Sequence, residues 1–198
     1  MGHRRRQAIR GRIRSKVVGG FLDHESALKL AQEELADEAT AEEVAALFGE
    51  VVAENEASKA AWPPVTDCDR LDAAFDDLNA RGIMARHDWW CCGSCGAAAM
   101  PEERERVEGL QPEQAVRGYA FYDNQDTDAA AAGDGLYLSY GAVDDSRAAA
   151  LEIGREVVTT LERHGLRTSW NGSLANRIGI ELVWQRRNRP ERWTESED

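Results

Sequence analysis

The sequence is poor in cysteine and lysine and has no long apolar segment. Its 198 residues include 4 cysteines, too few for a disulfide framework, so we expect free thiols in a reducing compartment. No apolar run approaches the roughly 18 residues that a membrane-spanning helix needs, and the arginines near the start precede no apolar stretch typical of a secretory signal. These absences predict a soluble, cytoplasmic protein without membrane contact.

Charge is distributed unevenly along an acidic chain. The net charge of −12 disfavours nucleic acid as a partner, because a polyanion gains affinity only where basic residues face it. Residues 1–20 nevertheless carry 7 basic side chains and no acid, whereas residues 21–60 carry 11 acids. This basic arm either pairs with the acidic region, forms a loosely ordered start, or binds an anionic partner. Arginine outnumbers lysine 21 to 3, which is typical of a GC-rich bacterial genome.

The first third of the chain is predicted to be helical. Asp23 is placed to cap a helix over residues 23–37, and Thr40 with Glu43 has the spacing of a capping box before a second amphipathic helix. Trp62-Pro63-Pro64 ends that helix, because proline cannot donate the helical hydrogen bond. We therefore expect a charged helical region over residues 1–62.

The rest of the chain changes to short segments rich in aromatic and branched residues. A helix begins near Thr66, another covers 148–164, and the alanine run 129–132 is predicted to be a loop. The pattern indicates an α+β domain over residues 65–187, with a mostly antiparallel five-stranded sheet and helices packed on one face, followed by a polar tail over 188–198. The expected strands are 83–90, 116–122, 136–140, 166–170 and 178–184.

Three cysteines, Cys91, Cys92 and Cys95, lie within five residues and offer the most distinctive chemistry. The Cys92-x-x-Cys95-Gly spacing is typical of a zinc knuckle, in which both thiolates point at one ion. The remaining ligands would come from Cys91, from His87, or from another thiol, histidine or acid brought near by folding; Cys68 and His164 are further candidates. Zinc is therefore the cofactor to test, although adjacent cysteines on an extended chain point to opposite faces.

The same pair has two other interpretations. Cys92 and Cys95 have the spacing of an attacking thiolate and a resolving thiol, and residues 97–108 can supply a short helix after them. The surrounding pattern does not indicate the βαβ unit that thioredoxin-type enzymes use. Alternatively, the thiols are small core residues that pack beneath Trp89 and Trp90 and bind nothing.

A run of polar residues, Asp123–Asp128, follows the predicted strand 116–122. Its alternating oxygens resemble the first half of a calcium loop. However, its sixth residue is not glycine, and Gly135 stands where the closing glutamate belongs, which excludes an EF-hand. We expect a turn whose acids cap neighbouring amides, with a polar ligand or metal site as the alternative.

Trp170 and Asn171 precede the last predicted strand, and Arg177 directly adjoins it. Tryptophan and arginine contribute much contact energy per residue, so these side chains are typical of a recognition surface. The alternative is that Trp170 simply closes the core.

Three stretches taken together resemble a known family: Gly82–Gly96, Gly118–Thr127 and Gly135–Gly141. They are similar to an uncharacterised bacterial family of actinobacterial type, described as a domain of unknown function. The resemblance covers about residues 15–187 and implies a domain of that extent without an established activity. Where we expect relatives to carry a histidine, this chain has Asp123, which argues against a histidine ligand or base there.

No nucleophile, base and orienter set is recognisable, so we expect a non-catalytic binding or regulatory module with a protein or small-molecule partner. The alternative is a thiol- or zinc-dependent enzyme centred on Cys92 and Cys95. The candidate ligand-binding residues are Tyr122, Gln125, Asp126, Trp170, Asn171 and Arg177.

Overall fold

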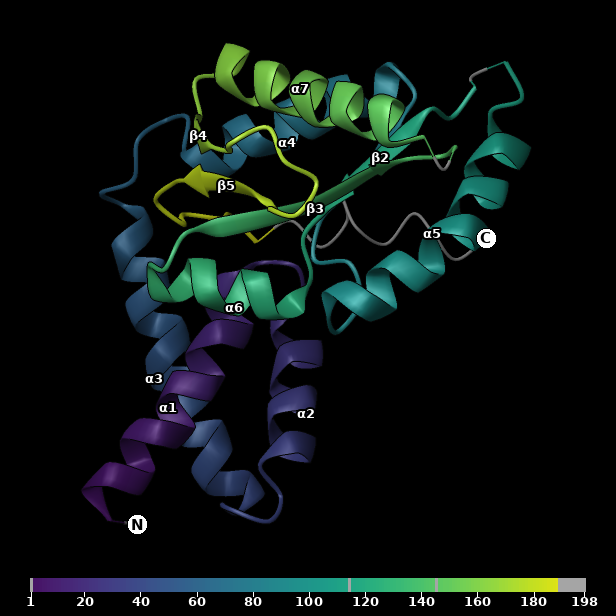
Figure 1. Ribbon diagram of the computed structural model, residues 1–198. Helices are drawn as coiled ribbons and strands as arrows, with labels where there is room; N and C mark the ends of the chain where they lie inside the picture. The colour runs from purple at the N-terminus through teal and green to yellow at the C-terminus, as the bar shows by residue number, and fades with distance from the viewer. Residues whose placement is uncertain (1, 114, 145, 189–198) are drawn as a thin grey trace. The chain divides into compact units, whose positions relative to one another are not determined.

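The computed structural model describes residues 2–113, 115–144 and 146–188 (Figure 1). The chain forms two compact units. One contains the residues up to Thr66 together with the chain from Gln185 onward, and the other is Asp67–Trp184. Most of the polar tail expected over 188–198 lies outside the described residues. In the described parts of the chain, no helix combines the length and apolar character needed to cross a bilayer.

The first unit is built from three helices around its own apolar core. Ile9, Ile13 and Val17 are buried against Leu47 and Val51. The helices are α1 (His3–Gly19), α2 (His24–Glu34) and α3 (Ala41–Lys59). Asp23 caps α2 and Thr40 caps α3, which confirms both predicted capping residues.

The basic arm at the start of the chain is helix α1, which lies in the region 1–62 that the sequence pattern predicted to be helical. Its cations pair within the unit: Arg6 Nη2 lies 2.6 Å from Glu50 Oε2, and Lys16 Nζ lies 2.9 Å from Glu34 Oε1. These partners come from the acidic region, so internal pairing accounts for much of the charge asymmetry.

Residues 185–188 pack in the helical unit, although the sequence pattern grouped 185–187 with the sheet. The Arg186 guanidinium lies 4.6 Å from the centroid of the Phe21 ring, and Asn188 Nδ2 donates to Leu22 O at 2.7 Å. The chain therefore returns to the first unit after its last strand, a contact between distant segments that no local pattern reveals.

The second unit is α+β, as predicted, with a five-stranded sheet in the order β1-β2-β3-β5-β4. The sheet is mixed, because β1 and β2 are parallel while the other pairs are antiparallel. A parallel pair requires a crossover connection, which α5 provides. The elements are α4 (Asp67–Ala80), β1 (Ile83–Arg86), α5 (Gly93–Leu110), β2 (Gly118–Phe121), α6 (Asn124–Ala132), β3 (Leu136–Ala142), α7 (Arg147–Arg163), β4 (Arg167–Ser169) and β5 (Ile178–Glu181).

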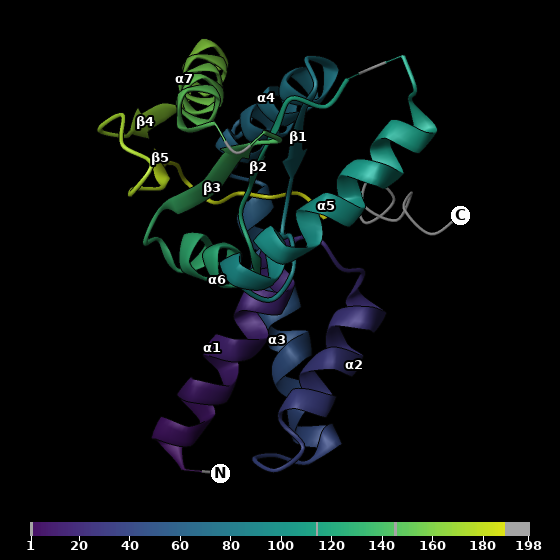
Figure 2. The ribbon, with the colours of Figure 1, turned by 45° about the vertical axis from the view of Figure 1, so that its right-hand side comes forward.

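Helices cover both faces of this sheet rather than one. Figures 1 and 2 show α4 and α7 on one side of the strands and α5 and α6 on the other. Ile153 of α7 contacts Gly118 of β2, whereas the ring of Phe121, on the opposite side of the same strand, meets Gly96 of α5. Successive residues of β1 and β2 point to opposite faces of the sheet, and most of them are buried. Both faces are therefore shielded from solvent by helices.

Candidate functional site

The carboxyl ends of the parallel strands β1 and β2 lead into two neighbouring loops, each of which opens a helix. Trp89 N donates to Tyr122 O at 2.8 Å, and Asn124 N donates to Trp90 O at 3.0 Å, so backbone hydrogen bonds join the loops. Asp88 and Trp90 have positive φ angles of 50° and 63°, which turn the chain sharply before α5. Such strand ends are where α/β proteins commonly place their ligands.

The three clustered cysteines lie at this point. Cys92 is the N-cap of α5, and Cys95 lies in its first turn. The three Sγ atoms all lie within 4.8 Å of one another, and those of Cys91 and Cys92 are 4.0 Å apart. The expectation that Cys91 and Cys92 point to opposite faces is wrong, because the chain here is a turn entering a helix and not a strand. All three are free thiols; Cys91 and Cys95 are exposed and Cys92 is half-buried.

The two cysteines of the Cys-x-x-Cys pair differ in acidity. The Cys95 amide, with a smaller contribution from the Cys95 thiol, lowers the pKa of Cys92 to about 7. Hydrogen bonding to the Cys92 and Cys91 sulfurs raises the pKa of Cys95 to about 11. A helix N-terminus favours an anion through its unpaired amides. The site therefore holds one thiolate near neutral pH beside one protonated thiol.

The start of α5 is fixed by close packing on aromatic rings. A Cβ on Gly96 would lie 2.6 Å from Phe121 Cε2 and 3.0 Å from Trp89 Cδ1, so only glycine allows this approach. Trp89 Nε1 also donates to Gly96 O at 3.1 Å. Trp90 stands edge-on to Trp89 at 6.3 Å between centroids and is 52% exposed. The cysteines thus lie on a rigid base next to an exposed indole.

The loop after β2 begins with a buried acid, Asp123, which is 3% exposed. Asp123 Oδ1 accepts from Gln125 N at 2.9 Å and Asp126 N at 3.2 Å, forming a capping box that starts α6. Burial, reinforced by the charge of Asp126, raises its pKa. The expectation of acids capping local amides is confirmed, while the loop predicted over 129–132 is wrong, since those residues continue the helix.

Asp123 also reaches the cysteine-bearing helix. Its Oδ2 lies 3.5 Å from the position of a Cβ on Gly93, the first residue of α5. Sequence reasoning placed Asp123 in a turn of capping acids and noted it as a departure from a family pattern, but it did not identify Asp123 as the cap of a helix. The Asp-x-x-Asp spacing with Asp126 was the signal that could have identified it as a helix cap.

His87, predicted as a metal ligand, lies in the core with both ring nitrogens facing other groups. Its Nδ1 is 2.9 Å from the Tyr122 hydroxyl, its Nε2 is 3.6 Å from Asp72 Oδ1, and its ring stacks on Phe75 at 4.3 Å. Tyr122, predicted to bind a ligand, is fully buried in the same cluster. Within the described chain, the potential metal-binding group at this point consists of the three cysteines.

Cys68 and His164, the other two candidates for a fourth metal ligand, have surroundings of their own. Cys68 is buried in α4. His164 Nε2 is 3.1 Å from Asp77 Oδ2.

Of the predicted ligand-binding residues, Asp126 and Arg177 are brought together. Arg177 Nη1 donates to Asp126 Oδ1 at 3.0 Å, and its Nη2 bonds both to Asp126 Oδ2 and to the carbonyl of Tyr137. Asp126 is almost buried and Arg177 is 40% exposed. This pair ties the residue before β5 to the first turn of α6, and Gln125 is exposed beside it.

Trp170 and Asn171 lie elsewhere. The Trp170 ring meets Tyr140 edge-on at 5.5 Å and touches Gly154 of α7, and its Nε1 donates to Ser173 O at 3.2 Å. Asn171 Oδ1 accepts from Ser173 N at 3.1 Å within the same loop. Because α7 and α6 cover opposite faces of the sheet, the predicted recognition surface is divided between them.

Fold and site together define an α+β protein with three clustered free thiols at the start of a crossover helix. Residues 3–188 match the family model described as Domain of unknown function (DUF6891), so the chain belongs to this family. The predicted resemblance to a domain-of-unknown-function family is confirmed. No curated protein and no solved structure matches the chain.

Proposed function

We propose that this protein carries out thiol–disulfide exchange, with Cys92 as the attacking thiolate and Cys95 as the resolving thiol. The observation that carries this proposal is the position of Cys92-x-x-Cys95 at the first turn of α5, the helix that connects β1 to the parallel strand β2. This is a βαβ unit, so the expectation that the sheet lacks one is wrong. The pKa of about 7 for Cys92 supports the assignment, because the thiolate is the nucleophile.

The exchange balances without any further cofactor. The Cys92 thiolate attacks one sulfur of a substrate disulfide, the substrate S–S bond breaks, and its other sulfur leaves as a thiolate that takes a proton. Cys95 then loses its proton and attacks Cys92 Sγ, which forms the Cys92–Cys95 disulfide and releases the second substrate thiol. The substrate gains two electrons, and a low-molecular-weight thiol returns them to the protein. Such thiols are abundant in the cytoplasm, the location that we propose.

Access favours a protein disulfide as the substrate. Cys95 and Cys91 are exposed, and the indole of Trp90 is exposed in the same loop. Large aromatic side chains contribute strongly to protein contacts, so Trp90 supplies an apolar surface for the residues around the disulfide. The divided recognition surface described above gives less support to a non-catalytic module.

The test is trapping of a mixed disulfide with oxidised glutathione, read by mass spectrometry of the intact protein. We expect the double variant Cys91→Ser/Cys95→Ser to accumulate one glutathione adduct on Cys92, because neither neighbouring thiol remains to resolve it. The Cys92→Ser variant should react much more slowly, and Cys68→Ser, which removes a buried thiol, should behave like the unchanged protein. Equal reaction rates for Cys92→Ser and the unchanged protein would contradict the proposal.

A metal site is the second candidate, favoured by the grouping of Cys91, Cys92 and Cys95. Tetrahedral zinc with bonds of about 2.3 Å places its sulfur ligands about 3.8 Å apart, close to the 4.0 Å between Cys91 and Cys92. The three thiolates would leave one coordination position for water or a partner's ligand. Native mass spectrometry separates the candidates: retained zinc that is lost from Cys91→Ser supports the metal site, and a metal-free protein that cycles between dithiol and disulfide supports exchange.

A further inference from the structure

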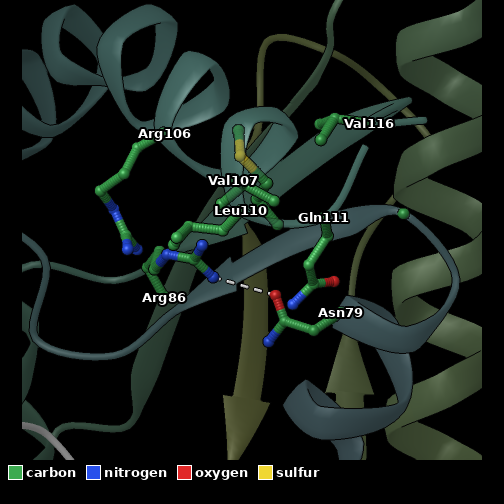
Figure 3. A pocket seen from close by; sticks show the side chains of 9 residues that line it. Asn79, Arg86, Arg106, Val107, Leu110, Gln111 and Val116 are labelled. Carbon is green, nitrogen blue, oxygen red and sulfur yellow. Dashed lines mark hydrogen bonds between the residues drawn. The ribbon is translucent and has the colours of Figure 1, made fainter. Parts of the chain in front are cut away.

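A cavity of about 220 Å³ lies between the end of α4, strand β1 and the last turns of α5 (Figure 3). One part of its wall is apolar and comes from Met84, Val107, Leu110 and Val116. Leu110, the last residue of α5, is 66% exposed and so forms part of the rim. The cavity therefore offers an apolar wall next to solvent.

Two arginines line the same cavity and share one buried acid. Arg86 Nε lies 2.6 Å from Glu103 Oε1, and Arg106 Nε lies 2.8 Å from Glu103 Oε2. The Glu103 side chain is 6% exposed; although burial opposes ionisation, the arginines hold its pKa below the ordinary value. Two guanidinium groups and one carboxylate leave this cluster with one net positive charge.

Each arginine keeps donors that Glu103 does not use. Arg86 Nη1 donates to Asn79 Oδ1 and to Ala85 O, both at 2.9 Å, whereas its Nη2 has no hydrogen-bond partner among the described residues. Arg106 donates through Nε and Nη2 to Glu103, and its Nη1 likewise has no partner in the described chain. Figure 3 shows both guanidinium groups on one side of the cavity. A guanidinium presents five donors, so an oxyanion here has N–H groups available from two residues.

We propose that this cavity binds a small monocarboxylate with an apolar chain. The carboxylate would accept from Arg86 Nη2 and Arg106 Nη1 and neutralise the single excess charge, while the chain would cover Val107 and Leu110. An apolar cavity of about 150 Å³ holds the six heavy atoms of benzene, so 220 Å³ corresponds to about nine heavy atoms. Hexanoate, with eight, is a suitable probe.

This binding site is independent of the thiol chemistry. Cys92 caps one end of α5 and Leu110 ends it, and an 18-residue helix is about 27 Å long. Failure of the proposed exchange reaction therefore leaves the carboxylate site untouched, and failure of carboxylate binding leaves the exchange reaction untouched.

The test is titration of the full chain with hexanoate, followed by calorimetry and by NMR shifts of the Val107, Leu110 and Val116 methyl groups. We expect saturable binding with a Kd of about 1 mM or tighter, which is the range for a ligand of this size. Neutral 1-hexanol should bind at least about tenfold more weakly, because it cannot use the arginine charges. Equal affinity for the two compounds, or no saturation by about 20 mM hexanoate, would overturn the proposal.

Substitutions at the rim provide a matched pair that leaves the fold intact, since Leu110 is largely exposed. Leu110→Glu adds a negative charge to the cavity rim, which repels the anionic ligand, and should weaken hexanoate binding about tenfold or more, whereas Leu110→Gln, of equal size, should weaken it about threefold or less. Similar affinities for these two variants would show that charge does not govern binding and would refute the assignment. Arg106→Gln, which leaves the Arg86–Glu103 pair in place, should also abolish the preference for hexanoate over 1-hexanol.

Discussion

Cys92 should react with an alkylating agent faster than an ordinary cysteine near neutral pH and more slowly than an ordinary cysteine at alkaline pH. Its pKa of about 7 arises from the Cys95 amide at the start of α5, with a contribution from the Cys95 thiol. The perturbation to apply is pH itself, on the fully reduced protein. Only the thiolate reacts, so the rate follows the ionised fraction.

The magnitude follows from two opposing effects. At pH 7 about half of Cys92 is thiolate, against about 3% of a thiol with a pKa of about 8.5, a ratio of roughly 16. A thiolate of lower pKa is intrinsically less nucleophilic, by about fivefold for this difference. Cys92 should therefore react about threefold faster than an ordinary thiol at pH 7 and about sixfold faster at pH 6. At pH 9, where both are ionised, it should react about fourfold more slowly.

The assay is iodoacetamide labelling between pH 5 and 9.5, quantified on the peptide that contains Cys92, with a short unstructured cysteine peptide as the reference. In Cys95→Ala the backbone amide remains and the side-chain donor is lost, so the midpoint should rise but stay below the reference value. A midpoint at or above that of the reference peptide, or a rate ratio that does not cross unity between pH 7 and 9, would refute the reasoning about the helix N-terminus.

Three further pairs of substitutions, each a variant with its control, test packing and charges by urea unfolding. Gly96→Ala forces a Cβ against two aromatic rings, whereas the Cβ of Gly109→Ala, in the same helix, meets open space. We expect the first variant to be about 1–3 kcal/mol less stable than the second. Equal stabilities would argue against the close approach at Gly96. Arg177→Gln leaves the almost buried carboxylate of Asp126 without its partner and should lower the stability by about 1–2 kcal/mol. Arg167→Gln removes one partner of an exposed pair and should change the stability by less than about 0.5 kcal/mol. The reverse order would contradict a structural role for the Arg177–Asp126 pair. Asp123→Ala removes the cap of α6 and should lower the stability by about 0.5–2 kcal/mol. Asp123→Asn should keep most of that stability, because its amide oxygen still accepts the capping hydrogen bonds. An equal loss of stability in both variants would show that the charge of Asp123 matters more than the cap.

The local pattern of the chain was sufficient to predict many of the helices and strands in both units. The alternation of apolar residues over 178–184 predicted β5, and the capping residue Thr40 predicted the start of α3, because both signals depend on neighbours a few residues apart. Helix α6 was missed because its alanine run carries no amphipathic pattern. Its start is fixed by the Asp123 capping box, and its position by Arg177, fifty-one residues away in the sequence.

The sequence alone determined the α+β class, the family, and the presence of three closely spaced thiols, because composition, periodicity and motif spacing are local properties of a chain. Tertiary structure decided where those thiols lie. The parallel pairing of β1 with β2 makes α5 a crossover helix, and only that geometry places Cys92 at a helix N-terminus, where unpaired amides favour its thiolate. Likewise, Arg86 and Arg106 are 20 residues apart in the sequence, and packing of α5 on β1 brings both to one buried carboxylate beside a cavity.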